Sequence, residues 1–354
     1  MRLCCSALNF NSMKNRHINI PVFIPHLGCP NNCTFCNQRT ISGVNEFVSE
    51  SVIPIIEEAL STITDNDTAE IAFFGGSFTG IDRTLMESLL SIANGYLKSG
   101  KISSIRCSTR PDYINGEILD ILNNFGVDTI ELGLQSVSEN VLSACKRGHT
   151  FEDADMACKM IRSRGFSLGG QMMIGLPSST IEDEIKTARF IVSSGASETR
   201  IYPTVVFRDT ELCESTLMGE YVPLSQEEAV SRSAEVFKIF VEAGVRVLRI
   251  GLCDSENLHS EDTYFAGPND AALGELVINR YYSNLLDEKL KDIKFESNSE
   301  LLIYAPKGHT SKIIGQHKKN KIRLLKEYGF SKVKIIESDM VMDYDVFLRI
   351  EERK

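Results

Sequence analysis

Short apolar runs alternate with amphipathic segments through the first 250 residues of the chain. The runs are rich in β-branched residues and predict strands near 21–25, 69–74, 104–109, 128–134, 169–175, 198–206 and 246–251. Between them, apolar residues at helical spacing predict helices near 49–61, 83–98, 116–125, 152–164, 180–194 and 225–243. This alternation is typical of parallel βα units. We therefore predict an α/β fold in which six or seven units form an open barrel.

Glycine and polar residues directly follow three of the predicted strands. Gly75 and Gly76 come after the second strand, Arg110 after the third and Gln135 at the end of the fourth. Because the chemistry of parallel barrels lies on the loops at the carboxyl ends of the strands, we expect these residues to share one site. A glycine pair is also consistent with a plain turn, and a lone arginine or glutamine in a loop is more often solvated.

Three cysteines stand close together after the first predicted strand. Cys29, Cys33 and Cys36 have the spacing C-x3-C-x2-C. Three thiolates can hold one iron–sulfur cluster, yet a cubane cluster has four irons and normally takes four cysteines. The remaining iron would be open to an external ligand, so the spacing predicts a redox centre. Phe35, between the last two cysteines, is placed to shield such a cluster.

Two other interpretations of the cysteines are weaker. A closed zinc site needs a fourth ligand, for which His26, Cys4 and Cys5 are the nearby candidates, and structural zinc pairs are usually spaced C-x2-C. Disulfides are not expected in a chain that shows no secretory leader and scatters its other cysteines. We interpret these others as core residues or incidental thiols; they are Cys4, Cys5, Cys107, Cys145, Cys158, Cys213 and Cys253.

Composition is compatible with a barrel and a small second unit. The 354 residues are 42% hydrophobic and 24% charged, which is ordinary for a globular protein. No stretch approaches the roughly 20 apolar residues needed to cross a bilayer, and the first 20 residues lack the apolar region of a signal peptide. We therefore expect a cytoplasmic protein without a membrane partner.

The cysteine loop and the glycine pair resemble those of the radical S-adenosylmethionine (SAM) enzymes. Between about residues 18 and 255 the chain further resembles the radical domain of the Elongator catalytic subunit, in the segments Ser108–Tyr113, Glu131–Ser136, Lys146–Thr150, Met172–Pro177 and Ile201–Thr204. The resemblance implies a partial (β/α)6 TIM-like barrel of the radical SAM type. It also implies a [4Fe–4S] cluster, SAM as cofactor, and a low-potential electron donor such as flavodoxin or ferredoxin.

The resemblance gives the first two motifs specific roles. Cys29, Cys33 and Cys36 would hold the cluster, and the Gly75–Ser77 segment would bind the amino group of the methionine part of SAM. The family usually has Glu where this chain has Ser77. Backbone carbonyls of Gly75, Gly76 and Ser77, instead of a carboxylate, would then receive the ammonium group.

Three further residues are candidates for the polar ends of SAM. A guanidinium suits a carboxylate and an amide suits ribose hydroxyls, which makes Arg110 and Gln135 candidates for these two roles. By resemblance, Arg147 is a second partner for the carboxylate. Weaker candidates for the cavity and its substrate side are His149, Arg200 and Tyr202.

The chain changes character after about residue 260, and we predict two domains, 1–260 and 261–354. Asn269 or Asp270 would cap a helix that carries Leu273, Leu276, Val277 and Tyr281. A small α+β domain would follow, with a strand at Glu300–Ala305, a helix at Ser311–Tyr328, and strands at Ser331–Ile336 and Tyr344–Ile350.

The predicted helix of this domain is strongly basic. Residues 306–328 contain one acid, Glu327, and seven bases: Lys307, Lys312, Lys318, Lys319, Lys321, Arg323 and Lys326. The local charge is +6, and since the whole chain carries −10, the remainder carries −16. The segment Lys307 to Lys326 could therefore bind tRNA or another RNA, although a solvated helix face fits equally. Ile313–Asn320 faintly resembles the backbone-clamping loop of KH domains, without its second glycine.

Together these features predict an enzyme that reductively cleaves SAM to a 5′-deoxyadenosyl radical for hydrogen abstraction from an unidentified substrate, RNA being one candidate. The alternatives are a noncatalytic iron–sulfur protein that binds RNA or regulates, and a radical enzyme acting on a small metabolite. We recognise neither the acetyltransferase domain of the Elongator subunit nor its basic N-terminal extension, so acetyl transfer to tRNA is not expected. The sequence leaves open the substrate, the oligomeric state, and whether SAM is consumed or regenerated.

Overall fold

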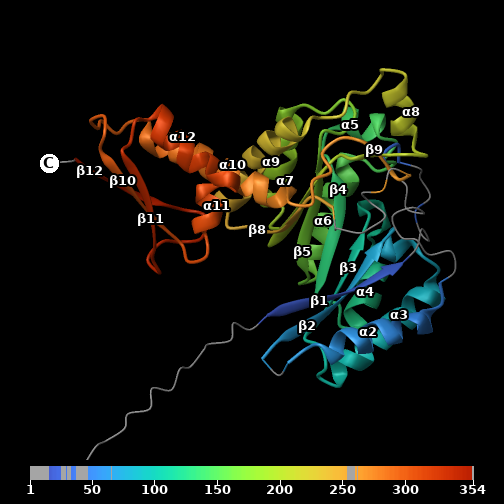
Figure 1. Cartoon of the computed structure of the whole chain (residues 1–354). Helices are drawn as coiled ribbons and strands as arrows, with labels where there is room; N and C mark the ends of the chain where they lie inside the picture. The colour runs from blue at the N-terminus through green and yellow to red at the C-terminus, as the bar shows by residue number, and fades with distance from the viewer. Residues whose placement is uncertain are drawn as a thin grey trace, which may run out of the picture.

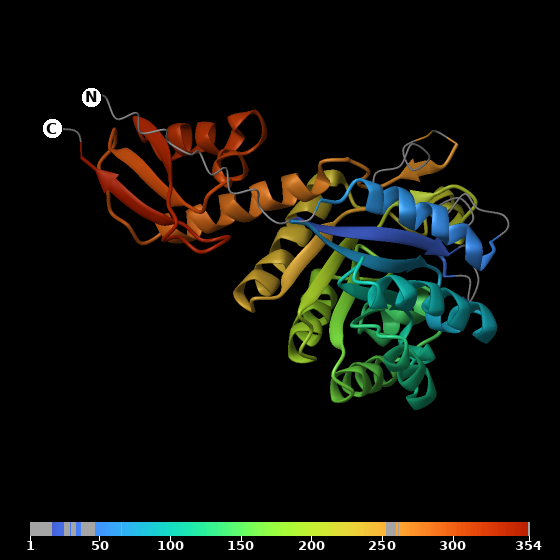
Figure 2. The same ribbon diagram turned by 90° about the horizontal axis from the view of Figure 1, so that it is seen from below.

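A curled sheet of seven parallel strands forms the larger part of the molecule (Figures 1 and 2). The computed structural model describes residues 16–24, 29, 33–36, 47–64, 66–252, 260 and 262–352. In spatial order the strands are β1 (His17–Ile24), β2 (Thr68–Gly75), β3 (Ser104–Thr109), β4 (Thr129–Gln135), β5 (Ser167–Ile174), β6 (Glu198–Pro203) and β8 (Arg246–Ile250). This arrangement confirms the predicted partial barrel.

Helices cover the outer face of the sheet and connect successive strands (Figure 2). They are α2 (Val52–Ser61), α3 (Arg83–Lys98), α4 (Gly116–Asn124), α6 (Phe151–Ser163), α7 (Ile181–Ser193) and α9 (Gln226–Glu242). Thr150, Thr180 and Ser225 each form a capping box with the third residue of the helix that they begin. These local signals explain why the predicted helix bounds are accurate to one or two residues for most of the barrel.

Several short elements were not predicted from the sequence. They are α5 (Glu139–Ala144), α8 (Glu211–Leu217), β7 (Val206–Phe207), β9 (Tyr264–Ala266) and the 3-10 turns η1 (Ser49–Ser51), η2 (Phe78–Gly80), η3 (Pro111–Tyr113) and η5 (Gln316–Lys318). The single strand predicted over 198–206 is wrong, because β6 ends at Pro203 and β7 pairs separately with β9. Strand β7 lies before residue 260 and β9 after it, so their pairing crosses the predicted domain boundary. The boundary itself stays a prediction.

The main core lies between the sheet and its outer helices. Ile71 and Phe73 of β2 are fully buried, and the Phe73 ring stacks on Phe78 with 4.6 Å between the ring centroids. Among the cysteines interpreted as core residues, Cys107, Cys145, Cys158 and Cys213 are buried, which confirms that interpretation for these four. Cys4, Cys5, Cys253 and the zinc-ligand candidate His26 lie outside the described residues. None of the described helices is long and apolar enough to cross a membrane.

A long helix, α10 (Leu273–Leu290), packs against α9 and leads to a second, smaller unit (Figure 1). The unit contains β10 (Glu300–Ala305), α11 (Thr310–Ile314), α12 (Lys319–Glu327), β11 (Lys332–Glu337) and β12 (Phe347–Glu351). Strand β10 lies in the middle of its sheet, parallel to β11 and antiparallel to β12. The structure thus contains the small α+β unit that the sequence predicts.

Two details of this region correct the sequence-based expectations. The single basic helix predicted over Ser311–Tyr328 is wrong, because α11 and α12 are separate helices. Gly315, His317 and Lys318 between them have φ values of 77°, 52° and 60°, which a right-handed helix cannot contain. The N-cap of α10 is Ala272 instead of Asn269 or Asp270; the Asp270 carboxylate accepts the Ala272 N–H at 2.8 Å and stabilises the preceding turn.

Candidate active site

The glycine pair lies where β2 ends beside β1. Gly75 has a φ of 115° and pairs with Ile24 of β1. A side chain at Gly75 would collide with the carbonyl oxygen of Ile24, so the sheet itself requires glycine at this position. The role that resemblance gives Gly76, close approach to a ligand, stays a prediction.

Ser77 connects the ends of β2 and β3. Its buried hydroxyl shares a 2.7 Å hydrogen bond with the Thr109 hydroxyl and accepts the Arg110 N–H at 3.2 Å. The Ser77 side chain therefore fixes the two loops relative to each other. Against the larger effect of burial, the Ser77 backbone acts to lower the pKa of the Cys29 thiol, so it lies on the side of the cysteine loop.

Arg110 is a buried cation with part of its hydrogen-bonding capacity unused. Its side chain is only 2% exposed, and its Nε and Nη2 donate to the two carboxylate oxygens of Asp112 at 2.9 and 2.8 Å. Its Nη1 is buried without a hydrogen-bond partner among the described residues. The bidentate edge is thus occupied by Asp112, and one NH2 group is left for another acceptor.

Gln135 ends β4 in a strained conformation. Its φ is 65°, and a tight turn forms around it because the Ser136 N–H donates to the Leu134 carbonyl at 2.8 Å. Its Oε1 atom is buried and has no hydrogen-bond partner in the described part of the chain. Backbone strain of this kind persists where the surroundings enforce it and is concentrated at functional sites.

Arg147 joins Gln135 to the cysteine loop. Its Nη2 donates to the Gly133 carbonyl at 2.7 Å, and its Nη1 lies 3.5 Å from the Cys33 sulfur. A Cβ at Gly133 would lie 2.9 Å from Arg147 Nη2 and 3.1 Å from Gln135 Nε2. Gly133 thus makes room for both side chains, and the structure brings Cys33, Gln135 and Arg147 together as the sequence predicts.

The three cysteines lie in and beside a tight turn. The Cys36 N–H donates to the Cys33 carbonyl at 3.0 Å; Cys33 is buried, and Cys29 and Cys36 are partly buried. Burial raises the pKa of the Cys29 thiol, while Arg147 and Arg110 act in the opposite direction. Within the described residues, no three His, Cys, Asp or Glu side chains are close enough to hold a metal ion. Cluster binding by these cysteines therefore stays a prediction.

His149 belongs to the same neighbourhood, although the sequence made it only a weak candidate. It is buried, and neither ring nitrogen has a hydrogen-bond partner among the residues that the structure describes. Burial, assisted by the charges of Arg147 and Arg110, lowers the pKa of His149 to about 3. The imidazole is therefore neutral at physiological pH and can accept one hydrogen bond and donate another.

A second buried polar layer fills the barrel nearer the amino ends of the strands. Arg106 contacts Glu70, Glu131 and Glu198, and Arg200 donates to Glu131 at 2.7 and 3.1 Å. Glu131 holds the Nε and Nη2 of Arg200, and the expectation that Arg200 faces a cavity stays a prediction. The remaining candidate on this strand, Tyr202, is partly buried. The sequence analysis did not identify this layer. The signal that could have revealed it is the presence of charged residues, such as Arg106 and Glu131, inside predicted strands.

Comparison with known proteins bears on this site. Residues 23–191 match the Radical SAM superfamily model, and residues 197–283 match the Radical_SAM C-terminal domain. A tRNA uridine(34) acetyltransferase of Methanocaldococcus infernus is 34% identical over 34% of this chain and 23% of its own length. The heme chaperone HemW of Bacillus subtilis is 24% identical over 78% of this chain and 77% of its own.

A solved structure agrees with the fold. Archaeal Elp3 of Methanocaldococcus infernus, with an N-terminal deletion, superimposes with a TM-score of 0.60 at 22% identity, over 78% of this chain and 64% of that one. The chain spans less than a third of the length of the tRNA uridine(34) acetyltransferase, so similarity to it concerns the radical domain. The chain belongs to the radical SAM superfamily and is an enzyme of the radical SAM class, homologous to the radical domain of Elp3 and the tRNA uridine(34) acetyltransferases.

Proposed function

We propose that the protein binds a [4Fe–4S] cluster through Cys29, Cys33 and Cys36 and cleaves SAM reductively beside it. The cluster, when bound, would supply one electron from a low-potential donor such as flavodoxin or ferredoxin, so that SAM would yield methionine and a 5′-deoxyadenosyl radical able to take a hydrogen atom from the substrate. The protein's own residues would bind and orient SAM and exclude water.

The observation that carries this proposal is a set of buried atoms near Cys29 and Cys33 that have no hydrogen-bond partner among the described residues. They are Arg110 Nη1, Gln135 Oε1 and both ring nitrogens of His149. An unsatisfied buried polar group costs roughly 1–3 kcal/mol, so several in one place indicate an additional binding partner. A cationic donor and an amide acceptor suit the carboxylate and the hydroxyl groups of SAM.

Each residue then has a defined task. Arg110 would donate its free NH2 group to the SAM carboxylate, with Arg147 as the second positive charge beside Cys33. Gln135 would accept from a ribose hydroxyl. The backbone between Gly75 and Ser77 would receive the ammonium group. Because Asp112 already holds two donors of Arg110, the carboxylate would be bound through one group instead of a bidentate pair.

For the substrate, we propose RNA. Support comes from the tRNA uridine(34) acetyltransferase among the relatives and from the basic segment Lys307 to Lys326. The heme chaperone HemW aligns over more than three quarters of both chains, which favours a small molecule as the second candidate for the substrate. Hydrogen abstraction from RNA predicts that RNA stimulates SAM cleavage, whereas a small-molecule substrate does not.

Anaerobic reconstitution tests the proposal. The wild-type protein should hold about four irons and four sulfides per chain and, with flavodoxin or dithionite, form 5′-deoxyadenosine. The triple variant Cys29→Ala, Cys33→Ala, Cys36→Ala should lose both. A matched variant with Cys107, Cys158 and Cys213 changed to alanine should keep the cluster. Zinc in the wild type, or iron retained by the first variant, would refute the cluster assignment.

The same assay with and without total tRNA tests the substrate class. A several-fold rise in 5′-deoxyadenosine formation on addition of tRNA supports RNA. An unchanged rate supports the small-molecule alternative, and absence of SAM cleavage by a cluster-loaded protein would refute the proposed reaction.

A further inference from the structure

The loop between α11 and α12 has a defined, unusual conformation. Gly315, His317 and Lys318 have positive φ, and the Lys318 N–H donates to the Gly315 carbonyl at 2.9 Å. Asn279 of α10 accepts the Gln316 N–H at 2.8 Å, and Asn320 donates to the Asn279 carbonyl at 2.9 Å. The loop Gly315–Lys318 is therefore held in place by buried side chains on both sides.

The order of elements around this loop is also specific. Strand β10, helix α11, the loop, helix α12 and strand β11 follow one another, the arrangement in which KH domains present a GXXG loop to the backbone of single-stranded nucleic acid. The second glycine of that motif corresponds to Lys318 here. With φ at 60°, Lys318 nevertheless adopts the left-handed conformation that glycine adopts readily.

Ion pairs and one ring contact divide the seven basic residues of Lys307 to Lys326 into two groups. Lys307 pairs with Asp339 at 2.7 Å, Arg323 pairs with Asp287 at 2.7 Å, and Lys312 lies over the Tyr344 ring. The other four have no ion pair with any described residue; they are Lys318, Lys319, Lys321 and Lys326. These uncompensated charges begin in the loop and continue along α12.

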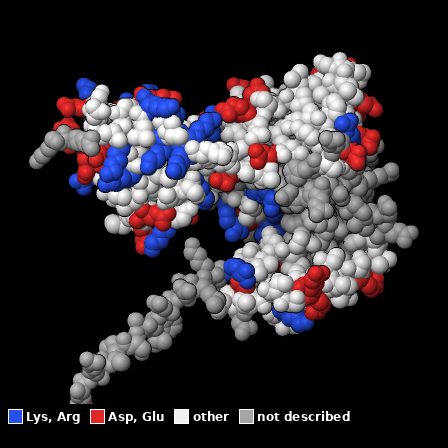
Figure 3. Space-filling view, in the orientation of Figure 1, with Lys and Arg blue, Asp and Glu red and all other residues white. Residues whose placement is uncertain are grey.

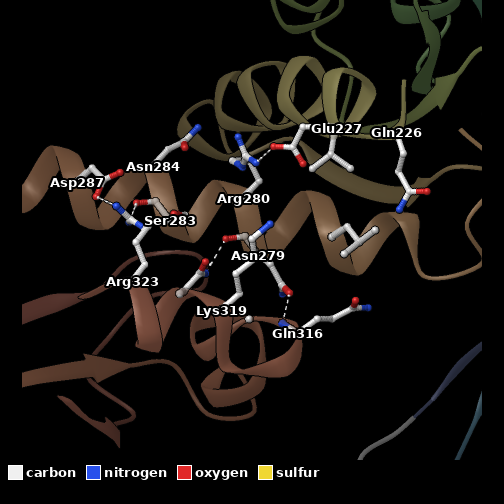
Figure 4. A pocket seen from close by; sticks show the side chains of 14 residues that line it. Gln226, Glu227, Asn279, Arg280, Ser283, Asn284, Asp287, Gln316, Lys319 and Arg323 are labelled. Carbon is white, nitrogen blue, oxygen red and sulfur yellow. Dashed lines mark hydrogen bonds and ion pairs between the residues drawn. The ribbon is translucent and has the colours of Figure 1, made fainter. Parts of the chain in front are cut away.

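The surface beside the loop combines this charge with an apolar residue and a cavity. Ile322 is 42% exposed, and at helical spacing it shares a face of α12 with Lys319 and Lys326. Lysine and arginine side chains gather on this unit in Figure 3. Beside the contacts with Asn279, a cavity of about 440 Å³ opens between the loop, α12, α9 and α10, with Gln316 and Lys319 on one side and α10 side chains opposite (Figure 4).

The cavity lining is mixed and offers hydrogen-bonding groups beside apolar surface. Asn284, Ser283 and Gln226 contribute the neutral polar groups, and Val230 and Leu276 the apolar ones. Its arginines are compensated, since Arg280 pairs with Glu227 and Arg323 with Asp287. The net positive charge therefore belongs to the loop and its lysines, and the cavity offers neutral donors and acceptors beside them.

We propose that this unit binds single-stranded nucleic acid, with the sugar–phosphate backbone crossing the loop Gly315–Lys318. Lys318 and Lys319 would neutralise phosphates, Ile322 would contact a base, and neighbouring nucleotides would enter the cavity. A four-residue loop contacts one backbone, which favours a single strand over a duplex. The site lies outside the SAM site; it rests on the proposed function only for the expectation that the bound strand is RNA.

Anisotropy titrations with a labelled single-stranded RNA of about 12 nucleotides test the proposal at two salt concentrations. The variant Lys318→Glu, Lys319→Glu should bind at least about tenfold more weakly and reduce the log–log salt slope by about 1.4, since each single-strand phosphate contact contributes about 0.7. A second variant, Gln316→Asp, His317→Asp, should also weaken binding. It should fold normally, because aspartate tolerates positive φ.

The matched control is Lys291→Glu, Lys294→Glu, which changes the net charge equally. Lys291 lies twelve residues beyond Asn279 at the end of α10, about 18 Å along the helix axis, so binding should be unchanged. The proposal is overturned if the wild type does not bind, if control and loop variants weaken equally, or if duplex RNA competes as well as single-stranded RNA. The triple cysteine variant should still bind RNA, and the loop variants should still cleave SAM without RNA, so failure here is distinguishable from failure at the radical site.

Discussion

The barrel contains two buried polar layers that differ in whether the protein completes their hydrogen bonds. In the lower layer, nearer the amino ends of the strands, Arg106 and Glu131 are surrounded by partners of opposite charge. In the upper layer, Arg110, Gln135 and His149 each keep a buried polar atom without a partner among the described residues. Both layers are polar and shielded from water. The difference indicates that the lower layer is structural and the upper one is shaped for a ligand.

Electrostatics support this division. Although burial opposes ionisation, the pKa of Glu131 is lowered because Arg200, Gln171 and Arg106 bond to its carboxylate. The protein thus stabilises the charge that it buries there. In the upper layer the pKa of His149 falls because burial and two arginines disfavour its charged form. No carboxylate of the described structure compensates it by a hydrogen bond.

The largest expected effect comes from breaking the lower layer. Arg106→Met would remove the cation shared by Glu70, Glu131 and Glu198 and leave buried charge uncompensated. We expect a loss of about 3–5 kcal/mol in the free energy of unfolding, measured by urea denaturation at pH 7. The exposed pair of Arg164 and Asp120 provides the control, since Arg164→Met should change the value by less than about 1 kcal/mol. Equal effects would show that the buried layer has no special structural role.

A smaller, pH-dependent effect is expected from His149 in the upper layer. Its folded pKa of about 3 is depressed below the unfolded value of 6.5, so the neutral form is favoured on folding. The associated stability is present above pH 6.5 and is lost as the pH falls from 6.5 towards 3, by at most about 1.4 kcal/mol per unit. Between pH 7.5 and pH 5 the wild type should lose about 2 kcal/mol more than His149→Leu in urea denaturation. If the free energy of unfolding changes equally with pH in the wild type and in His149→Leu, His149 is not buried without a partner.

The features that could be predicted from the sequence are those set by local pattern. The strand at 104–109 was predicted with its observed bounds, because Ile105 and Cys107 alternate with polar residues and a proline, Pro111, follows closely. The expectation that Arg110 and Gln135 share one site followed from the rule that the carboxyl ends of parallel strands meet. Arg147 follows α5 instead of a strand, and only resemblance to the radical SAM enzymes made it a candidate.

Features that depend on tertiary contacts were missed. Arg106 meets Glu131 only because β3 and β4 pair in one particular register, which no local pattern specifies. Gly75 was attributed to a ligand, whereas its φ and the carbonyl of Ile24 already require glycine. The break at His317 and Lys318 was missed because a lysine at positive φ is uncommon, and because histidine, although enriched there, is not a specific signal for it. Contacts of the loop with Asn279 enforce it instead.

Two glutamines allow the same chemical change to be made in each layer. Gln171 in the lower layer donates to Glu131 at 2.9 Å and to the Ser108 hydroxyl at 3.1 Å, whereas the Oε1 of Gln135 has no described partner. Shortening either side chain to Asn withdraws its amide, and asparagine tolerates the φ of 65° at Gln135. Gln171→Asn should therefore lower the free energy of unfolding by about 1.5–3 kcal/mol, whereas Gln135→Asn should leave it nearly unchanged.

Calorimetric titration of SAM into the cluster-loaded protein tests the division most directly. For Gln135→Asn we expect the Kd for SAM to rise about tenfold, equivalent to about 1.4 kcal/mol, with unfolding stability unchanged. For Gln171→Asn we expect a Kd within about threefold of the wild type at a temperature where both are folded. If Gln135→Asn binds SAM as tightly as the wild type, or if Gln171→Asn shows the larger loss of affinity, the upper layer is not the SAM site and the account is wrong.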